Sequence, residues 1–233
     1  MKRDKKILAA VLALVIVTQV YVFSITSSIY SENGFAIGFP EDANNPKIGL
    51  YLMYMIAPVL FLLFFTSGSM YEITHGYGKI LIIRNYSKTR LLMKKVLKNA
   101  GVLLSAVLLQ CLVFWPFNHL FLPVKNGMVQ SLLLYAIILH AIVLLQYLLE
   151  LFIPAQTANL ILFIYCFASC YAVQIFDVND WLKIALFPSL MFGMQNGAVN
   201  GEAIYGVYLA VGVCLNLLLT ALCIRKFKTT DIF

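Results

Sequence analysis

The chain has 233 residues, of which 62% are hydrophobic and only 12% are charged, with a mean hydropathy of +0.89. This composition is too apolar for a soluble domain and favours a protein whose solvent is lipid. The formal net charge of +7 is accompanied by no motif that reads a nucleic-acid groove, so the sequence argues against a nucleic-acid partner.

Six apolar segments are each long enough to cross a bilayer as a helix, because a crossing needs about 20 residues. We therefore expect an all-α polytopic membrane protein with a single transmembrane domain over residues 1–233. The stretches between the segments are too short to form a separate core. The predicted spans are 7–29, 48–70, 99–122, 129–151, 157–176 and 203–224.

The first apolar segment follows the charged residues MKRDKK, as in a secretory signal. Its apolar run is longer than the roughly 7–15 residues of a signal core. We therefore expect this segment to be retained as a spanning helix.

Basic side chains are distributed unequally between alternate loops. Four of the seventeen Lys and Arg residues precede the first span, seven lie in 71–98 and three follow the last span. Only Lys47, Lys125 and Lys183 lie in the remaining loops. Because Lys and Arg are retained on the cytoplasmic side of a membrane, and six crossings return the chain to its starting side, both termini are predicted to be cytoplasmic.

The stretch 71–98 combines these cations with apolar pairs between the second and third spans. On a helix, its apolar residues would form a stripe on the membrane while the cations reach water or phosphate headgroups. The residues Asn85, Tyr86 and Ser87 favour a turn, with Asn85 or Ser87 as a helix cap. The sequence therefore predicts two short amphipathic helices that meet in a cytoplasmic elbow.

Residues 181–194 are too apolar for a free loop and too short to cross the membrane, and Pro188 would interrupt a helix in their middle. Two interpretations remain open, a re-entrant or interfacial hairpin and an amphipathic surface helix. Non-helical backbone at membrane depth needs protein partners for its polar groups, so we expect a hairpin before the sixth span to pack back onto the bundle.

Polar side chains inside predicted spans are candidates for a translocation path, because such groups are costly in lipid. The alternative is that each one forms a hydrogen bond with a neighbouring helix, which contributes about 0.6 kcal/mol on average. Gln146 and Glu150 are four residues apart and therefore share a helix face. The candidate path residues are Gln110, His140, Gln146, Asn159 and Gln174.

All five cysteines fall within predicted spans. We expect them to pack as apolar side chains rather than to form disulfides. Cys166 and Cys170 are one helical turn apart, but no His or carboxylate lies near them in the sequence to complete a metal site. No catalytic, cofactor or metal-ligating residue is predicted in this chain.

The stretch after the second span resembles the type-2 ATP-binding-cassette (ABC) permeases. In that family a span ending in Glu is followed by a Gly, a hydrophobic pair, a Pro-x-Ser-Arg element and a Lys. This chain has Glu72, Gly76 or Gly78, Leu81 with Ile82, Ser87, Arg90 and Lys94 or Lys95, with Asn85 and Tyr86 where the family often has Pro. The six-span plan, the apolar hairpin and the basic tail RKFKTTDIF extend the resemblance over most of the chain.

The resemblance implies a permease subunit in a bacterial plasma membrane that exports a peptide or another amphipathic or hydrophobic compound. It further implies a cytoplasmic ABC ATPase as partner, which would hold ATP and Mg, and a second permease subunit in a homodimer or heterodimer. The chain itself has no phosphate-binding GxxxxGK[ST] loop, so it is not predicted to be an enzyme. The residues implied to couple to the ATPase are Glu72, Gly76, Gly78, Arg84, Tyr86, Ser87, Arg90 and Lys94.

Two other functions remain open. The chain could be a membrane anchor or immunity protein that does not transport, or the substrate-binding membrane subunit of a vitamin importer. An intramembrane protease is disfavoured because T-S-G-S-M at 66–70 lacks the G-x-S-G order and no second motif places His140 beside it.

Overall fold

The computed structural model describes residues 2–26, 48–75, 80, 82, 87–121, 128–176, 178–193, 195–198 and 203–230. Within these ranges every regular element is a helix. The helices are α1 (Lys2–Thr26), α2 (Ile48–Thr66), α3 (Ser69–His75), α5 (Lys88–Phe121), α6 (Met128–Glu150), α7 (Ala155–Ile175), α8 (Asp180–Ala185), the 3₁₀ helix η1 (Phe187–Met191) and α9 (Ile204–Thr229).

Five helical segments in the described part of the chain are long and apolar enough to cross a membrane. They are Met55–Thr74, Lys88–Val113, Val129–Glu150, Ala155–Ile175 and Ile204–Thr229. The apolar helical segment Lys6–Thr18 in α1 is shorter. The expected helical, multi-pass membrane fold is thus confirmed, whereas a sixth crossing and cytoplasmic termini remain predictions.

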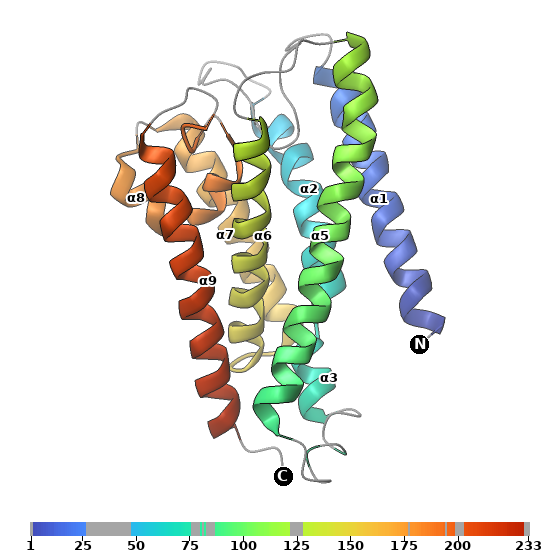
Figure 1. Cartoon of the computed structure of the whole chain (residues 1–233), viewed down its shortest axis with the longest axis vertical. Coiled ribbons are helices and arrows are strands. Elements are labelled where there is room, and N and C mark those ends of the chain that lie inside the picture. Colours follow the sequence, from blue (N-terminus) through green and yellow to red (C-terminus); the bar gives the residue numbers. More distant parts are fainter. Residues whose placement is uncertain are drawn as a thin grey trace.

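Helix α6 is the centre of the bundle and packs against α5, α7, η1 and α9 (Figure 1). Its residues Ile138, Leu139, Ala141, Ile142 and Leu144 are fully buried. A helix that is apolar on all sides belongs in a protein core or in lipid, because it has no polar face to present to water. Helix α1 packs on the outside, against α2 and α5.

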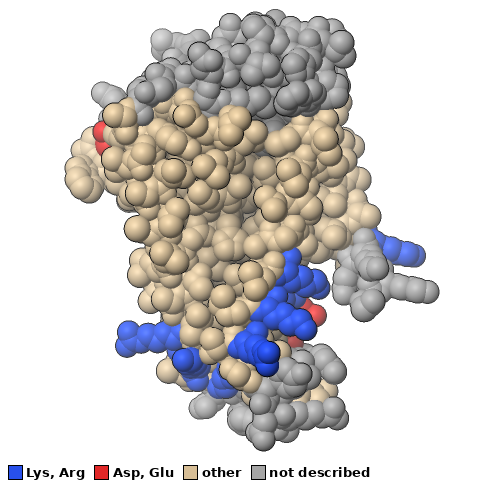
Figure 2. Space-filling model, viewed as in Figure 1, with Lys and Arg blue, Asp and Glu red and all other residues tan. Residues whose placement is uncertain are grey.

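One end of the bundle carries most of the positive charge. The first residues of α1 and α5 and the last residues of α9 lie toward the same end in Figure 1, together with α3. Lys and Arg side chains gather at this end in Figure 2, and the rest of the described surface in that view is largely uncharged. We call it the charged end.

The second predicted span is broken near its end. Helix α2 stops at Thr66, Ser67 and Gly68 form a turn, and α3 begins at Ser69. Gly68 has φ +73°, a left-handed conformation that cannot continue a right-handed helix and that glycine adopts without a steric penalty. The expected continuous helix over 48–70 is therefore wrong at its last turn.

The third predicted span begins earlier than expected. Helix α5 starts at Lys88 rather than at residue 99 and runs without interruption to Phe121. Ser87 directly precedes it, and the Ser87 carbonyl accepts the Leu91 N–H at 3.1 Å. The prediction of a separate second short helix is therefore wrong, because that stretch is the beginning of α5 and continues into the span. Of the first one only residues 80 and 82 lie in the described ranges.

The apolar hairpin folds as two short helices. The Asn179 side chain caps α8 by accepting the backbone N–H groups of Trp181 and Leu182, and η1 follows with Pro188 in its first turn. Ser189 and Leu190 in η1 are fully buried, and η1 packs against α6 and α7. The prediction that this segment packs back onto the bundle is confirmed for η1, whereas α8 has no buried residue, and the depth of the segment in a membrane remains a prediction.

Helices α6 and α9 approach each other closely at Gly212. A Cβ atom at this position would lie 3.0 Å from Cγ2 of Ile137, whereas one at Gly206, also in α9, would have no neighbour within 4 Å. We expect Gly212→Val to lower the free energy of unfolding by about 1–3 kcal/mol, because the extra atoms push the two helices apart. Gly206→Val is the matched control and should stay close to wild type when both are unfolded with SDS in mixed micelles. Equal effects of the two substitutions would contradict close packing at Gly212.

Candidate functional site

The turn between α2 and α3 is held by a carboxylate from α6. Glu150 accepts the backbone N–H of Gly68 through Oε1 at 2.8 Å and that of Met70 through Oε2 at 3.0 Å. These two N–H groups lie at the start of α3, where a helix provides no intrahelical acceptor. One side chain of α6 thus supplies the hydrogen bonds that the broken helix would otherwise lack.

Gln146, one turn earlier on α6, joins three helices. Its Nε2 donates to the Leu63 carbonyl at 2.9 Å and to Asn159 Oδ1 of α7 at 2.6 Å. Its Oε1 accepts the Thr66 hydroxyl at 2.7 Å. Gln146 is fully buried, so these bonds replace all of its contacts with water. The expectation that Gln146 and Glu150 share one face is confirmed, and that face holds the end of α2.

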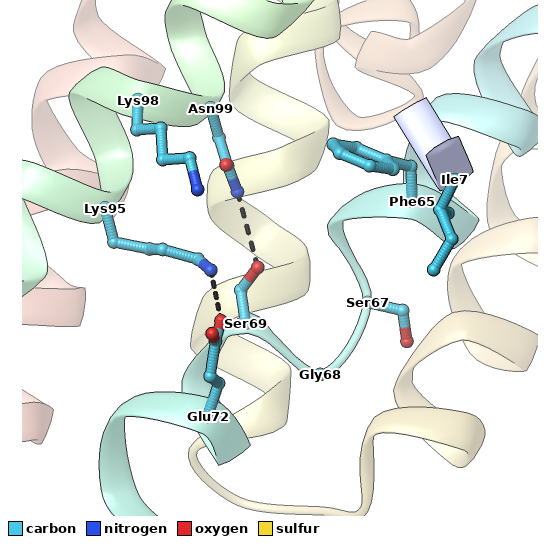
Figure 3. Close-up of a pocket in the computed structure, with 9 residues that line it drawn as sticks. All are labelled: Ile7, Phe65, Ser67, Gly68, Ser69, Glu72, Lys95, Lys98 and Asn99. Carbon is cyan, nitrogen blue, oxygen red and sulfur yellow. Dashed lines mark hydrogen bonds and ion pairs between the residues drawn. The ribbon is translucent and has the colours of Figure 1, made fainter. Parts of the chain in front are cut away.

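Helix α5 also contacts α3. Asn99 Nδ2 donates to Ser69 Oγ at 3.3 Å and also to the Tyr147 hydroxyl of α6, and all three side chains are buried. Nearer the charged end, Lys95 forms an ion pair with Glu72 (Figure 3). Glu72 is 65% exposed, so we assign this ion pair a small contribution to stability. We refer to α3, its turn at Ser67 and Gly68, and the first turns of α5 as the elbow.

The start of α5 is also attached to the end of α9. Lys88 Nζ donates to the carbonyl of Thr230 at 2.8 Å and to that of Lys228 at 3.3 Å. Ammonium groups suit the last carbonyls of a helix, which have no intrahelical donor and carry partial negative charge. The elbow is therefore connected to α6, α7 and α9 through side chains.

The residues predicted for ATPase coupling are only partly covered by the described ranges. Glu72 lies on α3, Ser87 precedes α5, and Arg90 and Lys94 lie on the first turns of α5, all of them exposed. Arg90 and Lys94 are four residues apart and share a helix face. The remaining four, Gly76, Gly78, Arg84 and Tyr86, lie outside the described residues.

The predicted path residues form separate pairs rather than one continuous line. Gln146 and Asn159 are bonded to each other, and Gln174 of α7 accepts Gln195 Nε2 at 2.8 Å. His140 Nδ1 lies 2.6 Å from Asn216 Oδ1 of α9. Gln110 of α5 is hydrogen-bonded to Tyr135 of α6. Each one joins its helix to another segment, as the alternative interpretation of these polar groups supposes.

In the part of the chain that the structure describes, the buried polar groups offer hydrogen bonds but no cluster suited to metal chemistry. Cys166 and Cys170 are buried in α7. Within the described residues, no three His, Cys, Asp or Glu side chains are close enough together to hold a metal ion. The arrangement supports mechanical connection between helices.

A family model described as a protein of unknown function (DUF2705) matches residues 8–233. The chain belongs to the DUF2705 family. No curated protein matches this DUF2705 chain, and no solved structure does. The matched region includes the elbow and the α6 residues that hold it.

Several residues that build the elbow of this DUF2705 protein were not predicted from its sequence. They include Ser67, Gly68, Asn99 and Tyr147. A usable signal was present in T-S-G-S at 66–69, because adjacent Gly and Ser residues are a recognised cause of sharp helix kinks. Tyr147 gave no such signal, because nothing in the sequence says which helix faces α5 at this depth.

Proposed function

We propose that this DUF2705 protein is the membrane-spanning permease subunit of an ABC transporter. In this proposal it lies in a bacterial plasma membrane, pairs with a second permease subunit, identical or different, and exports a peptide or another amphipathic or hydrophobic compound. A separate cytoplasmic ATPase binds ATP and Mg and drives the transport.

The observation that carries the proposal is that the apolar, spanning part of α5 and its charged first turns, which belong to the elbow, form one continuous helix. Helix α5 has 34 residues and is therefore about 51 Å long, whereas the hydrocarbon core of a bilayer is about 30 Å thick. Its first turns, with Arg90 and Lys94 exposed, thus have the length to extend beyond the apolar region. A rigid extension of a spanning helix is suited to pass the motion of a subunit outside the membrane to the helices within it.

The connections of the elbow support the same function. Glu150 and Gln146 tie the α2–α3 turn to α6 and α7, and Lys88 ties the start of α5 to α9. A displacement of the elbow would therefore act on several helices together. A segment that only fixed the orientation of the chain would need positive charge but no such set of hydrogen bonds to other helices.

The test is the association of the chain with an ATPase. We expect the wild-type chain, affinity-purified from its native membrane in mild detergent, to bring with it Mg-dependent ATP hydrolysis. Arg90→Gln combined with Lys94→Gln should reduce the co-purified activity about tenfold, because two exposed cations at an interface each contribute up to about 1 kcal/mol.

Lys183→Gln is the control, because it removes a cation from α8, on the other side of the predicted membrane. It should leave the co-purified activity unchanged. A wild-type chain that purifies without any ATPase would contradict the transporter and favour an immunity or anchor protein. Equal losses in the double variant and the control would contradict docking at the elbow.

A further inference from the structure

A pocket of about 290 Å³ lies beside the elbow, between α1, α2 and α5 (Figure 3). Lys95 and Lys98 of α5 line one wall, and Ile7 of α1 and Phe65 of α2 line the other. Gly68 and its neighbours in the turn lie between the two walls. The pocket therefore has a cationic side and an apolar side.

Among the described residues that line the pocket, there are two lysines and one carboxylate. Lys95 is paired with that carboxylate, Glu72. Lys98 is exposed and pairs with no acidic residue in the part of the chain that the structure describes. Glu150 does not line the pocket and accepts the N–H groups of Gly68 and Met70. Among the described residues, Lys98 is thus the lysine of the pocket that has no ion-pair partner.

The position of the pocket along the helices matches the headgroup level of a bilayer. Lys98 is the last Lys, Arg, Asp or Glu of α5, and the helix continues from Asn99 without another one. On α1 the last such residue is Lys6, which directly precedes Ile7 in the pocket wall. Both helices therefore change from charged to apolar at the pocket, as spanning helices do where headgroups meet acyl chains.

We propose that this pocket binds the phosphate headgroup of an anionic phospholipid. The Lys98 ammonium neutralises the phosphate, Ser67 in the turn offers a hydroxyl donor, and the first carbons of the acyl chains lie against Ile7 and Phe65. A basic pocket between spanning helices at this level is a recognised form of lipid site. The inference is independent of the proposed transport function, because it concerns the chain and the bilayer alone.

The experiment uses the full chain without any ATPase, purified in a nonionic detergent, with lipid binding measured by native mass spectrometry. Added phosphatidylglycerol should bind the wild type more tightly than added phosphatidylcholine. Lys98→Gln should weaken phosphatidylglycerol binding about fivefold, the contribution expected of one cation near an anionic lipid. Arg225→Gln removes an exposed cation at the same end but outside the pocket, and should leave the binding unchanged.

Competition with inorganic phosphate distinguishes a binding site for a lipid from a binding site for a soluble anion. Phosphate at millimolar concentration should not displace the bound lipid, because it has no acyl chain to contact Ile7 and Phe65. If phosphate displaced the lipid from the wild type but not from Lys98→Gln, the pocket would be a site for a soluble anion, and the proposal would be overturned. Equal weakening by Lys98→Gln and Arg225→Gln, or equal affinity for the two lipids, would also overturn it.

Discussion

The substitution Glu150→Ala is expected to lower the free energy of unfolding by about 3 kcal/mol. The Gly68 and Met70 N–H groups would both lose the carboxylate that accepts them, and a hydrogen bond to a charged group contributes about 1.5–3 kcal/mol. Glu150→Gln keeps one acceptor oxygen and should show about half of the effect. Reversible unfolding by SDS in mixed micelles measures both variants.

Hydrogen exchange of backbone amides shows where in the structure Glu150→Ala lowers stability. In Glu150→Ala the amides of Gly68 and Met70 should exchange faster than in the wild type, while those in the middle of α6 stay protected. Glu72→Ala is the matched control, since it removes an exposed carboxylate from the same elbow and should cost less than about 1 kcal/mol. A stability change no larger than that of Glu72→Ala would contradict the role assigned to Glu150.

The second large effect is expected from Gln146→Ala, at about 2 kcal/mol. The substitution leaves a cavity in a fully buried site and removes the donor to Asn159 Oδ1. Gln130→Ala is the control, because it makes the same change at an exposed position of α6 and should have little effect. The same unfolding measurement applies.

A double-mutant cycle tests whether Gln146 acts through its contact with α7. Gln146→Ala and Asn159→Ala should together cost about 1 kcal/mol less than the sum of the two single effects, since each removes the same hydrogen bond. Additive costs would mean that the two side chains do not interact, and the connection between α2, α6 and α7 would have to be made elsewhere.

The sequence predicted the apolar helices well because a bilayer imposes one strong requirement. A segment that crosses it must be about 20 residues long and apolar, and both properties are visible in the chain. The predicted spans 129–151 and 157–176 accordingly differ little from α6 and α7. Helix ends outside the apolar region are not constrained in this way, so the start of α5 at Lys88 was missed.

The elbow was harder to predict because it depends on contacts between distant residues. Glu150 and Gly68 are 82 residues apart, and neither one alone indicates that a carboxylate will cap a broken helix. The spacing of Gln146 and Glu150 showed that they share a face, but not which helix that face contacts. The positions of the cations were readable from the sequence, whereas the pairing of Lys95 with Glu72 needed the arrangement of α3 against α5.

The break at Gly68 gives the two helices that enter the charged end different mechanical properties. Helix α5 has no break between Lys88 and the turn that precedes Pro116, so a tilt imposed near Lys88 is passed along that length. Across the glycine turn, by contrast, α3 is joined to α2 by the turn alone and to α6 by the Glu150 carboxylate. One input at this end would therefore reach α5 along its own length and α6 through Glu150, and would reach α2 only by way of the turn.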